Sequence, residues 1–172
     1  MVEQLTQMAE AEGEKREVTN KRRLLYRELF AAITTERDPR QARLKAMRIL
    51  EQGERDGVLV PGRAEAEAQA YTNPWFLAFL KLEPGPTLAA VHQPVLVLNG
   101  ELDRQVPARL DLDAIRASLA NNPHLMVKEI PKLNHLFQTA ATGGGDEYAQ
   151  IEETLAPSAL SLISNWIREQ VQ

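Results

Sequence analysis

The first 70 residues carry apolar side chains at helical spacing. Between positions 21 and 33, and again between Ala42 and Leu50, apolar residues recur every three or four positions and charged residues fill the gaps. Asp38-Pro39 is a typical helix start, and Gly53 is a typical stop. A third stretch, 63–71, is rich in Ala and Glu. We therefore expect a helical region whose helices each bury one apolar stripe.

After residue 71 the pattern changes to strands alternating with helices. A continuous apolar run over 94–100, bounded by Pro and Gly, predicts a buried parallel strand. A helix over 107–120, a more amphipathic strand over 125–131 and a last helix over 157–171 complete a βαβ unit with one added helix. Two parallel strands cannot cover both faces and edges of their sheet, so we expect them to belong to a larger one.

Charge and proline place a boundary near Gln69–Thr72. Residues 1–70 contain 13 basic and 13 acidic residues, whereas residues 71–172 contain 7 and 11. Two prolines precede residue 71 and eight follow it. The chain is therefore predicted to be of the α/β class, with a helical region over 1–71 and an α/β region over 72–172.

Composition removes several classes of function. The chain has no cysteine, which excludes disulfides, thiolate metal sites and cysteine nucleophiles. Its net charge of −4 argues against nucleic-acid binding. No apolar run approaches the roughly 18 residues that cross a bilayer, and the start of the chain lacks the pattern of a signal peptide. We expect a cytoplasmic protein that does not bind membranes.

The candidate chemistry follows the two predicted strands. Asp103 comes after the first strand and His135 after the second, so both are expected at the same sheet end, where open parallel sheets place their catalytic groups. A carboxylate there can fix the tautomer of an imidazole that acts as a base. Asp103 also has a simpler interpretation, as a cap of the following helix. No grouping of His, Asp and Glu has metal-site spacing, and no cofactor is expected.

These segments resemble the C-terminal half of an α/β-hydrolase, in the bacterial esterase and serine-aminopeptidase-like branch. The resemblance is carried by segments spread over about 100 residues from Asn73 onward, namely 74–76, 94–107, 133–138, 151–154 and 163–167. It implies a partial α/β-hydrolase fold, in which 1–71 is a lid and the two strands are the last of the core sheet. It also implies that Asp103 is the acid and His135 the base of a Ser-Asp-His triad.

The nucleophile of that triad is missing from the sequence. The family places it in a G-x-S-x-G elbow, and no such motif occurs among these 172 residues. The four serines, Ser118, Ser158, Ser161 and Ser164, fall in predicted helices or at their starts. The resemblance therefore implies a carboxylic ester (acyl) hydrolase represented by its Asp/His half, and we expect the isolated chain to be inactive.

The resemblance also suggests substrate contacts and partners. Trp75 and Phe76 lie where the family can line its acyl pocket, although packing at the lid hinge is an equal interpretation. Thr139, Thr142, Tyr148 and Glu152 could shape the surroundings of His135. The expected partners are a small acyl or ester substrate in the complete enzyme, and an N-terminal half or a second copy at the open sheet edge. The alternative is a non-catalytic hydrolase remnant that acts as a protein-interaction module.

Overall fold

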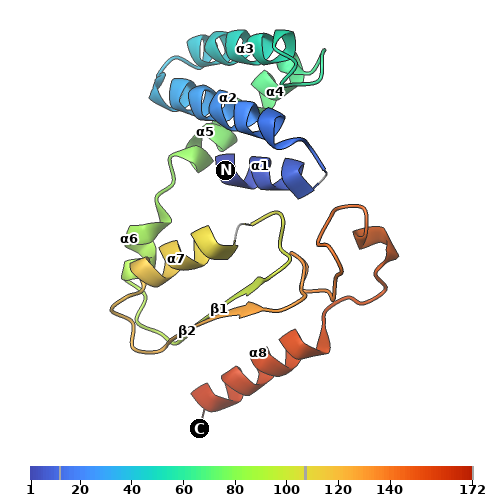
Figure 1. Cartoon of the computed structure of the whole chain (residues 1–172). Coiled ribbons are helices and arrows are strands. Elements are labelled where there is room, and N and C mark those ends of the chain that lie inside the picture. Colours follow the sequence, from blue (N-terminus) through green and yellow to red (C-terminus); the bar gives the residue numbers. More distant parts are fainter. Residues whose placement is uncertain (12, 107, 172) are drawn as a thin grey trace. The chain divides into compact units, whose positions relative to one another are not determined.

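The protein consists of two compact units, Met1–Leu82 and Glu83–Gln172. The computed structural model in Figure 1 describes residues 1–11, 13–106 and 108–171. The division falls after Leu82, later than the boundary that charge and proline predict. The reason lies in the aromatic segment that follows residue 73, because Phe76 packs against Phe30 and Tyr71 of the first unit.

The first unit is entirely helical. Its helices are α1 (Val2–Ala11), α2 (Arg16–Thr35), α3 (Pro39–Arg55), α4 (Ala64–Tyr71) and α5 (Pro74–Leu80). The predicted start of α3 is confirmed, because the Asp38 carboxylate accepts a hydrogen bond from the Arg40 amide at 2.9 Å. The predicted stop is wrong by a few residues: Gly53 is buried inside the last turns of α3, close to Leu25 and Leu59.

The core of this unit lies between α2 and α3, which run side by side (Figure 1). Leu29 and Ile33 of α2 and Leu50 of α3 are completely buried there. Ala42 and Ala46 are also fully buried, and their small side chains allow the two helices to approach closely. The helical spacing of the sequence thus marked most of the faces that the unit buries, although Leu24 and Leu44 in the same two stretches are exposed.

The second unit contains a two-stranded parallel sheet. Its elements are α6 (Pro84–Ala89), β1 (Val95–Gly100), α7 (Ala108–Ser118), β2 (Leu125–Ile130), the short 3-10 helix η1 (Tyr148–Gln150) and α8 (Pro157–Gln170). The register pairs Val95 with Leu125 and Gly100 with Ile130. Both predicted strands and both predicted helices are present within two residues of the expected ends, except that Pro107 lies outside the described residues.

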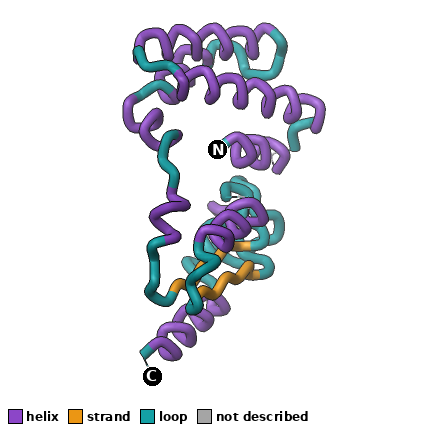
Figure 2. Tube along the Cα trace, turned by 90° about the vertical axis from the view of Figure 1, so that its left-hand side faces the viewer, coloured by secondary structure: helices purple, strands orange, loops and turns teal. Residues whose placement is uncertain are grey.

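Helices α7 and α8 lie on opposite sides of this sheet (Figures 1 and 2). On the α8 side a small core forms around Ile130, Leu133 and Ala159, with Leu98 and Leu162 at its margin. The mixed α/β class predicted from the sequence is confirmed, with two strands as its only sheet in the described part of the chain. Leu160 and Ile167 of α8, and Val171 directly after it, remain exposed.

Candidate acid–base site

The loops that leave the two strands are joined to each other at the carboxyl end of the sheet. The Glu101 amide donates to the Ile130 carbonyl and the Leu102 amide to the Leu133 carbonyl, both at 2.9 Å. Gly100 allows this contact, since a Cβ there would lie 2.6 Å from the Asn134 carbonyl oxygen. Residues that follow β1 are therefore held against residues that follow β2.

Asp103 is buried in the first of these loops, with 5% of its surface exposed. Its Oδ1 accepts hydrogen bonds from the amides of Gln105 and Val106 at 2.9 and 2.8 Å. Its Oδ2 accepts from Nδ1 of His135 at 2.9 Å and from Nδ2 of Asn99 at 3.3 Å. Oδ1 thus orders the loop ahead of α7, which agrees in part with the interpretation of Asp103 as a helix cap. Oδ2 faces the histidine.

His135 is the more accessible member of the pair, with 36% of its side chain exposed. An ionised carboxylate only accepts hydrogen bonds, so the contact with Asp103 requires the proton of neutral His135 to be on Nδ1. The other ring nitrogen, Nε2, then keeps a lone pair. A buried acid thus sets the tautomer of a partly exposed base, which is the arrangement of an acid–base pair in nucleophilic catalysis.

Asn134, next to the histidine, shapes the loop that carries it. Its side chain is completely buried. Oδ1 accepts from the amides of Leu136 and Gln138 at 3.0 and 2.9 Å, and Nδ2 donates to Oε1 of Gln138 at 2.9 Å. The backbone adopts φ values of 60° at Lys132 and 56° at Phe137, which non-glycine residues rarely adopt. Such locally strained backbone is common where a loop must aim a functional side chain.

A third segment, residues 141–148, supports both loops. The Tyr148 hydroxyl accepts a hydrogen bond from the His135 amide at 3.3 Å. On the other side, Nε of Arg104 donates to the Thr142 carbonyl at 3.1 Å. Gly143, at φ 74°, lies so close to the Leu102 backbone that no Cβ would fit. Of the four residues suggested around His135, Tyr148 contacts its backbone directly.

Glu147 holds this supporting segment together, because its carboxylate accepts hydrogen bonds from the amides of Ala141, Thr142 and Gly143. Burial pushes the pKa of Glu147 up, but the amides of Gly143, Ala141 and Thr142 outweigh that effect and hold the pKa below its usual value. A carboxyl group whose pKa is lowered on folding stabilises at neutral pH, and the contribution is lost as the pH falls through the folded pKa.

We therefore expect acidification below about pH 5 to lower the amide protection factors over 141–143, each measured against the intrinsic exchange rate at the same pH, because protonated Glu147 accepts these hydrogen bonds less well. E147Q should show low protection factors already at pH 7, with little change between pH 7 and 4. Glu152, a nearby exposed acid, provides the control E152Q, which should keep the wild-type profile. Equal protection in wild type and E147Q at pH 7 would contradict this assignment.

Trp75 and Phe76, the other predicted site residues, belong to the first unit. Phe76 is partly buried in its aromatic cluster, 5.2 Å from the Tyr71 ring centroid. Trp75 is 71% exposed and stacks on Phe79, with ring centroids 5.6 Å apart. The structure therefore assigns Phe76 a packing role and leaves Trp75 free to contact a ligand.

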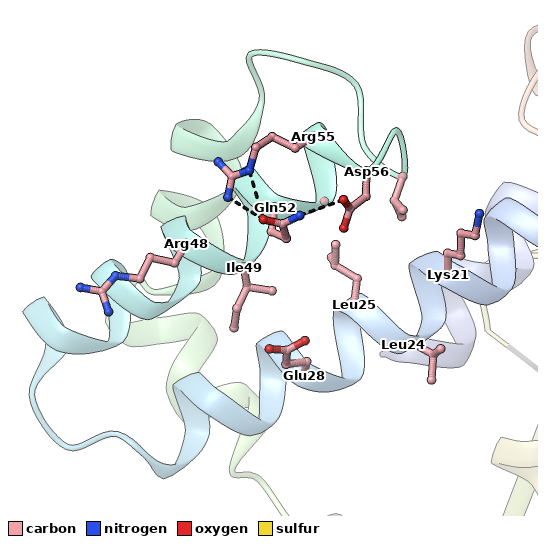
Figure 3. Close-up of a pocket in the computed structure, with 11 residues that line it drawn as sticks. Lys21, Leu24, Leu25, Glu28, Arg48, Ile49, Gln52, Arg55 and Asp56 are labelled. Atoms are coloured by element: carbon pink, nitrogen blue, oxygen red, sulfur yellow. Dashed lines mark hydrogen bonds between the residues drawn. The ribbon is translucent and has the colours of Figure 1, made fainter.

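The first unit also contains a groove of about 900 Å³ between α2 and α3 (Figure 3). Leu24, Leu25 and Ile49 form its apolar part, and Gln52 bridges Arg55 and Asp56 at its rim. Its charged residues are of both signs, and the groove has neither a histidine nor a hydroxyl nucleophile. It is a recess between packed helices whose lining has acidic and basic side chains but no histidine paired with a carboxylate.

The described residues contain no group of three or more His, Cys, Asp or Glu side chains able to hold a metal. Within the same residues, no helix combines the length and the apolar character that crossing a membrane requires. Comparison with protein-family models, with curated protein sequences and with solved structures found no match.

Sequence reasoning missed the polar residues that surround the pair. Asn99, Gln105, Asn134, Gln138 and Glu147 all fix the loops or the carboxylate. One signal was available: Asn99 ends an otherwise apolar strand, and an amide at a buried position requires partners. Several partners are close in sequence, such as Asp103 for Asn99 and Gln138 for Asn134, but only the folded loops bring their polar atoms together, so the pattern alone could not name them.

Proposed function

We propose that this chain supplies the acid and the base of a Ser-Asp-His hydrolase with an α/β-hydrolase fold, acting on carboxylic esters. One observation carries the proposal: the buried Asp103 carboxylate, after β1, accepts from Nδ1 of a half-exposed His135, after β2, at 2.9 Å. Parallel strands that deliver a carboxylate and a histidine to one sheet end are the second half of such a triad.

In this mechanism His135 works through Nε2. It accepts the proton of a serine hydroxyl as the serine oxygen attacks the ester carbonyl, and Asp103 stabilises the imidazolium that forms. His135 then returns the proton to the departing alcohol, leaving an acyl-enzyme. Water next attacks the acyl carbon while His135 takes its proton. His135 then gives that proton to the serine oxygen as the bond to the acyl carbon breaks, which releases the carboxylic acid and restores the serine.

The nucleophile of the proposed enzyme comes from polypeptide outside these 172 residues. Ser118 donates its hydroxyl to the Ala114 carbonyl at 2.9 Å near the end of α7. The other three serines belong to α8, a regular helix. A nucleophilic serine needs an exposed, strained turn beside an oxyanion hole, which a regular helix does not provide. The resemblance would then make the first unit the lid, and the exposed Trp75 is the residue of that unit that we propose as a contact for the acyl group.

The 172-residue chain alone is expected to hydrolyse a chromogenic short-chain ester no faster than buffer, since it lacks both nucleophile and oxyanion hole. The second part of the test is to read the DNA in frame upstream of the Met1 codon, in search of the missing nucleophile. A G-x-S-x-G segment there, expressed with this chain, should give turnover and serine labelling by a fluorophosphonate. A His135-dependent rate from the chain alone would contradict the expectation, and a complete protein without turnover or labelling would reject the proposed function.

The alternative function, a protein-interaction module, is favoured by one observation. Within the described residues the sheet has only two strands, so each strand has an unpaired edge. Leu160 and Ile167 of α8, and Val171 directly after it, are exposed. Open edges and apolar patches are sites of pairing with other chains.

We therefore expect the isolated chain to self-associate, with an apparent mass by light scattering that rises with concentration. I167E should lower that mass by making the exposed face of α8 charged, whereas E169K, on the same helix, should not. A strictly monomeric chain with a concentration-independent melting temperature would argue against an exposed docking edge.

A further inference from the structure

Asn99 is buried beside the acid–base pair and touches it directly. Only 7% of the residue is exposed, although it is an amide at the end of an apolar strand. Its Nδ2 lies 3.3 Å from Oδ2 of Asp103, the same oxygen that accepts from Nδ1 of His135 at 2.9 Å. Two donors from different elements therefore converge on one carboxylate oxygen.

The orientation of the Asn99 amide follows from this contact. An ionised carboxylate repels a carbonyl oxygen and attracts an N–H group, so Nδ2 must face Asp103. That orientation leaves Oδ1 of Asn99 buried, with no hydrogen-bond partner in the part of the chain that the structure describes. A buried, unpartnered acceptor destabilises a fold, and an apolar side chain of similar size would avoid this cost.

We propose that Asn99 is a positioning residue that aims Oδ2 of Asp103 at His135; this inference rests on the proposed function. The Gln105 and Val106 amides fix Oδ1 of the carboxylate, and Asn99 fixes the second oxygen. With both oxygens held, the carboxylate cannot rotate away from Nδ1, and the Nδ1–H tautomer of His135 is favoured. Asn99 acts through Asp103 and touches no reacting atom.

The test uses the ¹⁵N-labelled 172-residue chain and long-range ¹H–¹⁵N spectra, which report the tautomer of His135 without requiring activity. N99L removes the donor and the unpartnered acceptor together. We expect it to raise the ratio of Nε2–H to Nδ1–H tautomer about two- to tenfold, the effect of one ordinary hydrogen bond. The melting temperature should stay the same or rise, because the buried unpartnered oxygen is gone.

The matched control is N122L in the same unit. Asn122 is equally buried, donates to the Val91 and Gln93 carbonyls at 2.9 Å and accepts from the His124 amide. N122L should lower the melting temperature and leave the His135 signals unchanged. N99A serves if N99L does not fold, and it too should shift the tautomer ratio because it lacks the donor to Asp103.

D103N distinguishes the positioning role of Asn99 from the role of the Asp103–His135 pair itself. If D103N shifts the His135 tautomer and the Asn99 variants do not, the positioning role of Asn99 is overturned while the acid–base pair stands. If D103N itself leaves the His135 signals unchanged, the pair does not set the tautomer, and the proposed function fails with the inference. A shift in N122L equal to that in N99L would reduce Asn99 to a structural residue and overturn the proposal.

Discussion

If the proposed hydrolase function holds, H135Q in the complete protein is expected to lower kcat about 10⁶-fold and D103N about 10⁴-fold, with little change in KM. Glutamine cannot accept the serine proton, so the nucleophile is no longer activated. D103N keeps the shape of the acid but offers an N–H group to Nδ1 of His135, which favours the tautomer whose Nε2 already carries a proton. KM changes little because neither residue provides the main substrate contacts.

The measurement is steady-state hydrolysis of a chromogenic ester by wild type and variants, with folding checked by circular dichroism. The matched control is H124Q, the same substitution in the same unit, at a histidine whose backbone amide is bonded to Asn122. It should retain nearly full activity. Folded H135Q and D103N proteins that keep more than a tenth of the wild-type kcat would show that the pair does not perform the chemistry.

Substitution G100A is expected to destabilise the second unit by about 3 kcal/mol, the upper part of the usual range for overpacked sites. The new Cβ would lie 2.6 Å from the Asn134 carbonyl oxygen and 2.7 Å from the Leu133 carbonyl carbon, both backbone atoms. Backbone atoms cannot rotate aside, so the loop that carries His135 must move. The intrinsic strand preference alone would predict that G100A stabilises the unit, because glycine inside a strand is about 0.5–1 kcal/mol less favourable than alanine.

Urea unfolding monitored by His135 resonances would measure the loss, together with any change in the signals of the native state. G145A is the matched control, because Gly145 has open space around its Cβ position and no positive φ. It should be neutral or slightly stabilising. A G100A protein as stable as wild type, with His135 unmoved, would mean that the two loops are not packed as closely as the structure has them.

Much of the local structure followed from the sequence. The apolar run after Pro94 and the amphipathic run from Leu125 became β1 and β2, and Asp38-Pro39 started α3. These features depend on neighbours within a few residues, through side-chain periodicity and capping, so a sequence pattern can predict them. The two residues proposed as acid and base were also selected this way, from their positions after consecutive strands.

Other features required the folded chain. The boundary between the units depends on aromatic rings from α2, α4 and α5 that meet only in three dimensions. The surroundings of the pair come from β1, the 131–139 loop and the 141–148 segment, and their hydrogen bonds join residues up to 43 positions apart. The periodicity of apolar residues along the chain does not predict such contacts.

The sequence by itself thus determined helices α2, α3, α4, α7 and α8, the two strands, and the order in which an acid and a base follow those strands, because these depend on short-range propensity and side-chain pattern. Helices α1, α5 and α6 were not predicted. The tertiary structure decided that Asp103 is buried and bonded to Nδ1 of His135, that Asn99 shares its oxygen, and that Gly100 must lack a side chain. These are matters of distance and burial between separate segments, and only the packed chain fixes them.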